Sequence, residues 1–98
     1  MSGILRFEWD IDKATKNLEK HGISFDEAKT VFYDERAVLF NDPDHSQDED
    51  RFLLLGLSQN LRLLIVSHCL READDVIRII SARKATTTEA RKYEEFNY

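Results

Sequence analysis

Residues 77–84 read Ile77-Arg78-Ile79-Ile80-Ser81-Ala82-Arg83-Lys84, an apolar run with an arginine in its middle and a basic pair at its end. The run has the composition of a β-strand. Because a buried arginine is costly without a partner, Arg78 predicts a sheet surface that holds a carboxylate or another anion. A phosphate site on this strand is therefore plausible.

A run of strands precedes this segment. Apolar side chains are concentrated in residues 37–40, 51–58, 61–70 and 76–82, and polar segments separate these ranges. Gln59-Asn60 predicts a tight turn, and residues 71–75 predict the next one. Because strands joined by such short turns run antiparallel, the second half of the chain is expected to form an antiparallel meander.

The N-terminal part predicts one short strand and a helical hairpin. Residues 5–9 alternate between apolar and polar side chains, as in a strand. Asp10 or Asp12 can cap a first helix, which Gly22 ends. A second helix begins at Ser24. The order strand, two helices, strands indicates an α+β fold.

Two Ser/Thr-x-x-Glu patterns mark helix starts. Ser24 is followed by Glu27, and Thr86 is followed by Glu89, so both pairs match a capping box. The second pattern predicts a last helix that runs through Phe96. The chain is thus expected to end in a helix.

Length and composition predict one domain over residues 1–98. A 98-residue chain with 42% hydrophobic residues suits a single core. No run reaches the length of a membrane helix, and the first residues lack the apolar region of a signal peptide, so a cytoplasmic location is expected. Cys69 is the only cysteine, which excludes an intramolecular disulfide and is typical of a small core residue.

The net charge of −5 is unevenly distributed. Residues 34–50 contain seven acids and one base, whereas residues 51–92 contain eight bases and four acids, a local balance of +4. A basic half can meet phosphate while an acidic half stays away from it. Scattered, solvated charges are an equally valid interpretation of this composition.

Side-chain alternation places candidate catalytic groups on one strand face. His68 shares a face with Leu64 and Val66 on its strand, and Arg78 shares one with Ile80 on the next. If these faces are the same, His68 and Arg78 converge in an arrangement suited to phosphodiester cleavage, with an imidazole for proton transfer and a guanidinium for the phosphate. The alternatives are a structural His68 and an Arg78 that bridges to Glu8 or Asp10.

A metal site is a further alternative. Asp42, Asp44 and His45 carry oxygen and nitrogen ligands, and acids follow at 48–50. The spacing matches neither an EF-hand loop nor a zinc motif, and the segment contains the only proline. A solvated turn is therefore the stronger interpretation.

The whole chain also resembles the BrnT toxin family in ordered blocks. The blocks are Phe7-Glu8-Trp9-Asp10, Asn17 to Phe25, Glu27-Ala28, Val31-Phe32, Gly56-Leu57-Ser58, Arg62-Leu63-Leu64, Arg78 to Ala85 and Tyr93-Glu94, together with Asp42, His45, Glu49, Arg51 and Glu89. The resemblance implies a RelE-like fold, in which an N-terminal strand and a two-helix hairpin pack on a curved antiparallel sheet with a C-terminal helix.

The resemblance further implies a bacterial ribonuclease toxin of a type II toxin–antitoxin system. Such a toxin inhibits translation and growth by metal-independent RNA cleavage, needs no cofactor, and is neutralised by a BrnA-like antitoxin with a ribbon-helix-helix domain. The expected assembly is a 2:2 heterotetramer that contacts operator DNA only through the antitoxin. A rival interpretation is an antitoxin-binding module without nuclease activity.

Site residues are expected in three groups. His68, Arg78 and Arg83 are the catalytic candidates, and Lys84, Arg62 and Arg51 are the RNA-binding candidates. His45 with Glu49 is a second acid–base candidate, because a carboxylate can orient a histidine and raise its pKa. No metal ligand is expected in this mechanism.

Overall fold

The computed structural model describes residues 5–44, 51–71 and 75–97. These residues form five strands, three α-helices and one 3₁₀-helix. In chain order the elements are β1 (Arg6–Glu8), α1 (Ile11–His21), α2 (Phe25–Thr30), η1 (Val31–Tyr33), β2 (Val38–Asn41), β3 (Arg51–Leu57), β4 (Leu63–Arg71), β5 (Val76–Lys84) and α3 (Thr87–Phe96). Among the residues described, no helix is both long and apolar enough to span a membrane.

The strands form one mixed sheet in the order β1-β5-β4-β3-β2. β2 to β5 pair antiparallel, as their short connections predict, but β1 pairs parallel with β5, so the expected purely antiparallel sheet is wrong at this edge. The physical reason is the connection: about 70 residues separate Glu8 from its partner Arg78, and no tight turn fixes the direction of so distant a pair.

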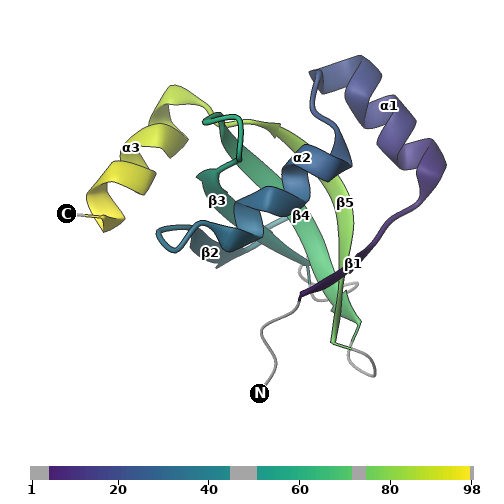
Figure 1. Cartoon of the computed structure of the whole chain (residues 1–98). Helices are drawn as coiled ribbons and strands as arrows, with labels where there is room; N and C mark the ends of the chain where they lie inside the picture. Colours follow the sequence, from purple (N-terminus) through teal and green to yellow (C-terminus); the bar gives the residue numbers. More distant parts are fainter. Residues whose placement is uncertain (1–4, 45–50, 72–74, 98) are drawn as a thin grey trace.

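Helices α1 and α2 cover one face of the sheet, where both contact β5, and η1 contacts β3 (Figure 1). The core forms between this face and the helices. Its fully buried side chains include Ile23, Phe25, Leu64, Val66 and Ile79. We call this the helix face of the sheet.

One polar residue fastens α1 to the sheet. Asn17 is buried, and its Nδ2 donates to the carbonyl oxygens of Ile23 and Ala82, both at 2.9 Å. Its Oδ1 accepts from the backbone N–H of Ala82 at 3.0 Å. The amide thus satisfies backbone groups of β5 that would otherwise be buried without partners.

The helix ends follow the sequence signals with one exception. Asp10 caps α1, Gly22 ends it with φ of 73°, and Thr86 with Glu89 forms a complete capping box. Ser24 accepts from the N–H of Glu27 at 3.0 Å, but the Glu27 carboxylate bonds to Arg62 and Ser58 instead. Only half of the expected box at Ser24 is therefore confirmed, because a tertiary ion pair takes the glutamate.

Helix α3 lies at one end of the opposite face, well apart from α1 (Figure 1). The Nζ of Lys92 lies 5.9 Å from the centre of the Phe40 ring, and Phe40 is the register partner of Leu53 and hence of Ser67. This row is on the opposite side of the sheet from buried Leu54 and Val66. The rest of that face carries no described helix.

Candidate functional site: the arginine face of the sheet

Arginine side chains gather on the sheet face opposite α1 and α2. The register places Arg51, Cys69, Arg78 and Glu8 in one row across four strands. Directly paired residues project from the same side, as do residues two apart along a strand. We call this side the arginine face, and its described arginines are Arg6, Arg51, Arg71, Arg78 and Arg83.

A polar pocket of about 210 Å³ opens on this face. Ser67 and Ser81, which line it, are register partners, and Arg51 and Arg83 lie in the rows on either side of them. The complete lining is Asp42, Asp44, Arg51, Leu53, Ile65, Ser67, Ser81 and Arg83. Two guanidinium groups and two hydroxyl groups are donors of the kind that bind phosphate oxygens.

Arg83 already has a carboxylate partner. Its Nη1 and Nη2 donate to the two oxygens of Glu89 on α3, each at 2.9 Å, and Nη1 also donates to the Lys84 carbonyl at 3.2 Å. The hydrogen bonds from Arg83 lower the pKa of Glu89 to about 2, so the pair is ionised at neutral pH. A guanidinium has five N–H donors, and these three bonds leave two for a ligand.

The alternative in which Arg78 bridges to Glu8 is confirmed. Nη1 of Arg78 donates to Oε2 of Glu8 at 2.9 Å, and Nη1 of Arg71 donates to the same oxygen at 3.1 Å. Two guanidinium groups thus share one carboxylate, and the group of three carries a formal charge of +1. The side chains of Arg71 and Arg78 are 56% and 36% exposed.

His68 does not converge with Arg78, so that expectation is wrong. His68 is 3% exposed and packs edge-on against Phe32, with ring centres 4.8 Å apart. A β-bulge interrupts the register after Ser67, and His68 pairs with buried Ile79 while Arg78 projects from the arginine face. Burial holds the pKa of His68 below its ordinary value.

Arg62 and Lys84 lie away from the arginine face. Arg62 forms an ion pair with Glu27: its Nε donates to Oε2 at 2.9 Å, and its Nη2 makes a second, short contact with Oε1. Arg62 immediately precedes β4, and its Nη2 also donates to the carbonyl oxygen of Gly22 at 3.3 Å. Exposed Lys84 is the register partner of buried Leu64, so it projects from the side opposite Arg83.

The acidic loop begins with a local turn at the pocket rim. Oδ1 of Asp42 accepts from the N–H of Asp44 at 3.0 Å, which is the turn expected of an Asp-Pro-Asp sequence. His45 and Glu49, the second acid–base candidates, lie outside the described residues. Asp44 and Arg51, which precede and follow the undescribed segment 45–50, both line the pocket.

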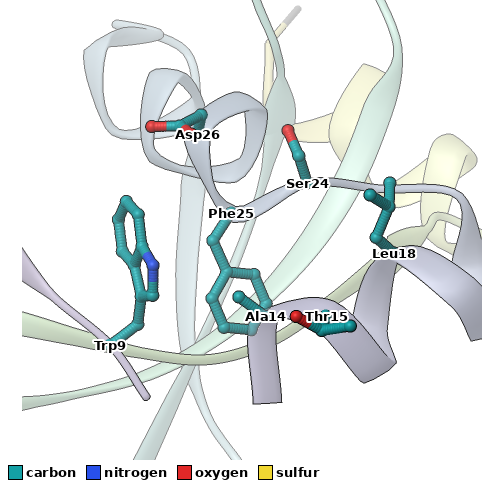
Figure 2. A pocket seen from close by; sticks show the side chains of 7 residues that line it. All are labelled: Trp9, Ala14, Thr15, Leu18, Ser24, Phe25 and Asp26. Atoms are coloured by element: carbon teal, nitrogen blue, oxygen red, sulfur yellow. The ribbon is translucent and has the colours of Figure 1, made fainter. Parts of the chain in front are cut away.

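A second cavity, of about 200 Å³, lies between α1 and α2 on the other side of the molecule. Figure 2 shows Trp9 standing at its edge beside Phe25, with Leu18 at the far end and the Asp26 carboxylate at the rim. The ring centres of Trp9 and Phe25 are 5.8 Å apart in an edge-on contact. Among the described residues that line this groove, none is basic, so it offers no phosphate site.

Together, the fold and the arginine face define a small α+β protein with a polar pocket, in which two arginines and two serines supply donors of the kind that bind phosphate and two aspartates complete the lining. The sequence model of one family, described as the ribonuclease toxin BrnT of type II toxin–antitoxin systems, matches residues 9–89. The chain therefore belongs to the BrnT family of ribonuclease toxins, and membership implies an antitoxin partner.

A solved structure supports the same fold. The 1.1 Å crystal structure of the Brucella abortus ribonuclease toxin BrnT matches with a TM-score of 0.66 and 22% identity, covering 86% of this chain and 100% of that one. The fold resemblance is confirmed at this level, and the RelE-like grouping stays a prediction. No curated protein sequence matches the chain.

Sequence reasoning missed four members of the arginine face. Arg6, Arg71, Ser67 and Ser81 were not among the candidates, although Ser67 and Arg71 share the alternation of Ile65 and Cys69 along β4. That alternation was a usable signal. The position of Ser81 beside Ser67 could not be predicted from the sequence, because the bulge shifts β5 by one residue at that point.

Proposed function

We propose that this chain is a metal-independent endoribonuclease that binds the scissile phosphate of RNA in the pocket on the arginine face. The observation that carries the proposal is the convergence of Arg51, Arg83, Ser67 and Ser81 on one cavity. Family membership supplies the reaction class, RNA cleavage.

The proposed chemistry is transesterification within the RNA strand. A base takes the proton of the 2′-hydroxyl, the 2′-oxygen attacks the adjacent phosphorus, and the 5′-oxygen leaves with a proton from an acid. The products are a 2′,3′-cyclic phosphate and a 5′-hydroxyl end. Arg51 and Arg83 offset the additional negative charge on the pentavalent phosphate, which is where preorganised cations accelerate a reaction most.

Two histidines are candidates for proton transfer. His68 would need to leave a position that is 3% exposed, since a general base must come within hydrogen-bond reach of its proton. His45 with Glu49 is favoured, because Asp44 and Arg51 at the two ends of that segment line the pocket. Arg78 lies on the same face but outside this pocket, where it binds Glu8.

The test is cleavage of naked RNA by the purified, antitoxin-free chain in excess EDTA. We expect cleavage with 5′-hydroxyl ends, which a polynucleotide kinase labels without prior phosphatase treatment. Arg83→Ala, Arg51→Ala and His45→Ala are each expected to lower the rate by at least tenfold, in the range of a positioned charge or a proton-transfer group. Lys13→Ala on α1 is the control.

Three outcomes would contradict this proposal. Loss of cleavage in EDTA with recovery in Mg²⁺ would favour the metal alternative at Asp42, Asp44 and His45. Activity that falls with His68→Ala and not with His45→Ala would return the proton-transfer role to His68. Growth arrest by a chain that cleaves no naked RNA would indicate ribosome-dependent action.

The second candidate is an antitoxin-binding module without nuclease activity. The observation that favours it is that Arg78 and Arg83 both bind carboxylates within the chain, as they would bind acidic side chains of a partner. A protein that binds its antitoxin, neither arrests growth nor cleaves RNA, and loses antitoxin binding on Arg83→Ala would match this candidate.

For either candidate we propose a BrnA-like antitoxin with a ribbon-helix-helix domain and a 2:2 assembly. The net charge of −5 suits a division of labour in which the antitoxin supplies the DNA contacts. Light scattering on the co-expressed complex measures the stoichiometry, and operator binding by the complex but not by the toxin alone is the expected result.

A further inference from the structure

The arginines of this protein differ in how completely their charge is neutralised. Arg83 has Glu89 as its own carboxylate, and Arg62 has Glu27, with both carboxylate oxygens engaged in each pair. Arg71 and Arg78 instead share the single oxygen Oε2 of Glu8. The surplus positive charge of these ion-paired groups is therefore at Glu8 and not in the pocket at Arg83.

We call Arg71, Arg78 and Glu8 the Glu8 cluster, and its position relative to the pocket is set by the sheet. Arg83 is the register partner of Ile65 on β4, and Arg78 is the partner of Cys69 on the same strand. The four residue steps from Ile65 to Cys69, and hence from the row of Arg83 to the row of Arg78, span about 13 Å at the usual rise of a strand. The row of Ser67 and Ser81 lies between the two.

The Glu8 cluster has unused hydrogen-bonding capacity. Arg71 and Arg78 each donate from Nη1 to Glu8, and a guanidinium has five N–H donors in a planar fork. Both side chains are more than a third exposed, so a ligand can reach them. Arginine forks that face outward from a sheet match the oxygens of a phosphate group.

We propose that the Glu8 cluster is a second phosphate subsite, which binds a phosphodiester of the same RNA strand on one side of the scissile group. This inference rests on the proposed function. Both sites lie along β4, the pocket at Ile65 and Ser67 and the cluster at Arg71. They therefore fit successive phosphates of a single-stranded RNA. The row of Ser67 and Ser81, in the middle of the pocket, lies two residues along β4, or about 7 Å, from the row of Arg78. At the 3.4 Å rise of a stacked strand this distance corresponds to about two nucleotides. The substrate class is therefore single-stranded RNA longer than a dinucleotide.

Glu8 has a defined part in this subsite. Its carboxylate holds the two guanidinium groups side by side, and it also occupies the position that a phosphate oxygen would take. Removing its charge while keeping its shape should therefore strengthen RNA binding, whereas a carboxylate that only supports the fold would give no gain. Glu8→Gln separates these two roles.

The experiment measures binding of a fluorescent 2′-O-methyl RNA hexamer, which lacks the attacking hydroxyl and stays intact, by fluorescence anisotropy over a series of salt concentrations. Arg71→Ala is expected to weaken binding about fivefold and to lower the log–log salt slope by about 0.7, the value for one phosphate contact on a single strand. Glu8→Gln is expected to tighten binding. A dinucleotide should bind wild type and Arg71→Ala equally.

The controls are Lys13→Ala and Glu19→Gln, which make the same charge changes on exposed positions of α1, over the opposite face. Equal effects of Arg71→Ala and Lys13→Ala would overturn the subsite, because the change in net charge alone would then explain the weaker RNA binding. So would weaker binding by Glu8→Gln, or a preference for duplex RNA. If the wild type binds no RNA at all, the proposed function fails with it; if it binds RNA and the variants do not differ, only the subsite fails.

Discussion

The hydroxyl of Tyr93 donates a 2.7 Å hydrogen bond to Oδ2 of Asp34, which joins helix α3 to the segment that follows η1. The same oxygen accepts from the N–H of Leu57 at 2.8 Å, so Asp34 links α3 to β3 as well. Burial and this bond raise the pKa of Tyr93 from 10 to about 12, so the hydroxyl stays a donor into alkaline solution. Within Thr87–Phe96 no residue is buried, so polar contacts of this kind hold the helix in place.

Tyr93→Phe should therefore destabilise the protein without altering its fold. The variant loses a hydrogen bond to a charged acceptor, a loss of about 1.5 kcal/mol in the free energy of unfolding. Urea denaturation measures the difference. Tyr33→Phe is the control, because Tyr33 is 58% exposed and its ring, 6.4 Å from that of Phe7, keeps its contact. Equal midpoints for Tyr93→Phe and wild type would show that this bond contributes nothing net.

The Glu27 carboxylate predicts sensitivity to acid. Hydrogen bonds from Arg62, and further from Ser58, lower its pKa from 4.5 to about 2 against the opposing effect of burial. Because the pKa is lower in the folded state than in the unfolded chain, the stabilisation is complete above pH 4.5 and is lost as the pH falls towards 2. Glu27→Gln should lower the unfolding free energy by roughly 2 kcal/mol at pH 7 and flatten its dependence on pH below 4.5.

Urea midpoints measured at closely spaced pH values between 7 and 2 test this expectation. Glu19→Gln, at an exposed position on α1, is the matched control and should keep the wild-type profile. Glu89 also has a pKa of about 2, so part of the acid dependence should persist in Glu27→Gln. A variant with an unchanged profile would contradict the assignment to Glu27.

His68 predicts a second, milder pH effect. Burial holds the pKa of the folded imidazole below 6.5, so the unfolded chain binds the proton more readily. Stability is then fully present above pH 6.5 and falls as the pH drops below that value. His68→Gln should remove this part of the pH dependence. Thermal unfolding of both proteins between pH 7.5 and 5.5 makes the comparison, and parallel curves would count against a buried, neutral histidine.

Asn17 predicts a local effect on β5. Asn17→Asp keeps the shape but replaces Nδ2, which donates to the carbonyls of Ile23 and Ala82, with an oxygen that can only accept. We expect a loss of about 3 kcal/mol, within the range for a buried polar group without compensation. Hydrogen exchange should show faster exchange of the Ala82 amide, which donates to Asn17 in the native protein. Lys16→Ala, one position earlier and exposed, should leave that amide protected.

The local elements were predictable from the sequence because their signals are local. Asp10, Gly22 and Thr86 mark helix ends by side-chain and backbone chemistry that involves only near neighbours. The turn at Gln59-Asn60 likewise set the antiparallel register of β3 and β4. The basic character of the second half was predicted as well, and its described arginines on β3 to β5 are on one face.

Apart from the bridge between Arg78 and Glu8, which was one of two stated alternatives, the relationships between distant residues were not predictable in this way. One extra residue in β5, at the bulge opposite Ser67 and His68, moves Arg78 to the face opposite His68. Nothing in the alternation of residues 76–82 reveals that shift. The pairing of Arg62 with Glu27 depends on how α2 lies on the sheet, and the parallel contact of β1 with β5 depends on the whole chain between them.

The parallel pairing of β1 with β5 also sets the order of events during synthesis. Glu8 leaves the ribosome about 70 residues before its partner Arg78. The hydrogen bonds between Asn17 and Ala82 likewise form only after Ala82 has been made. A nascent chain can bring the β3–β4 hairpin together early, whereas closing the sheet at β1 must await the synthesis of β5. The arginine face is thus completed late in folding, after the strands at its centre have already paired.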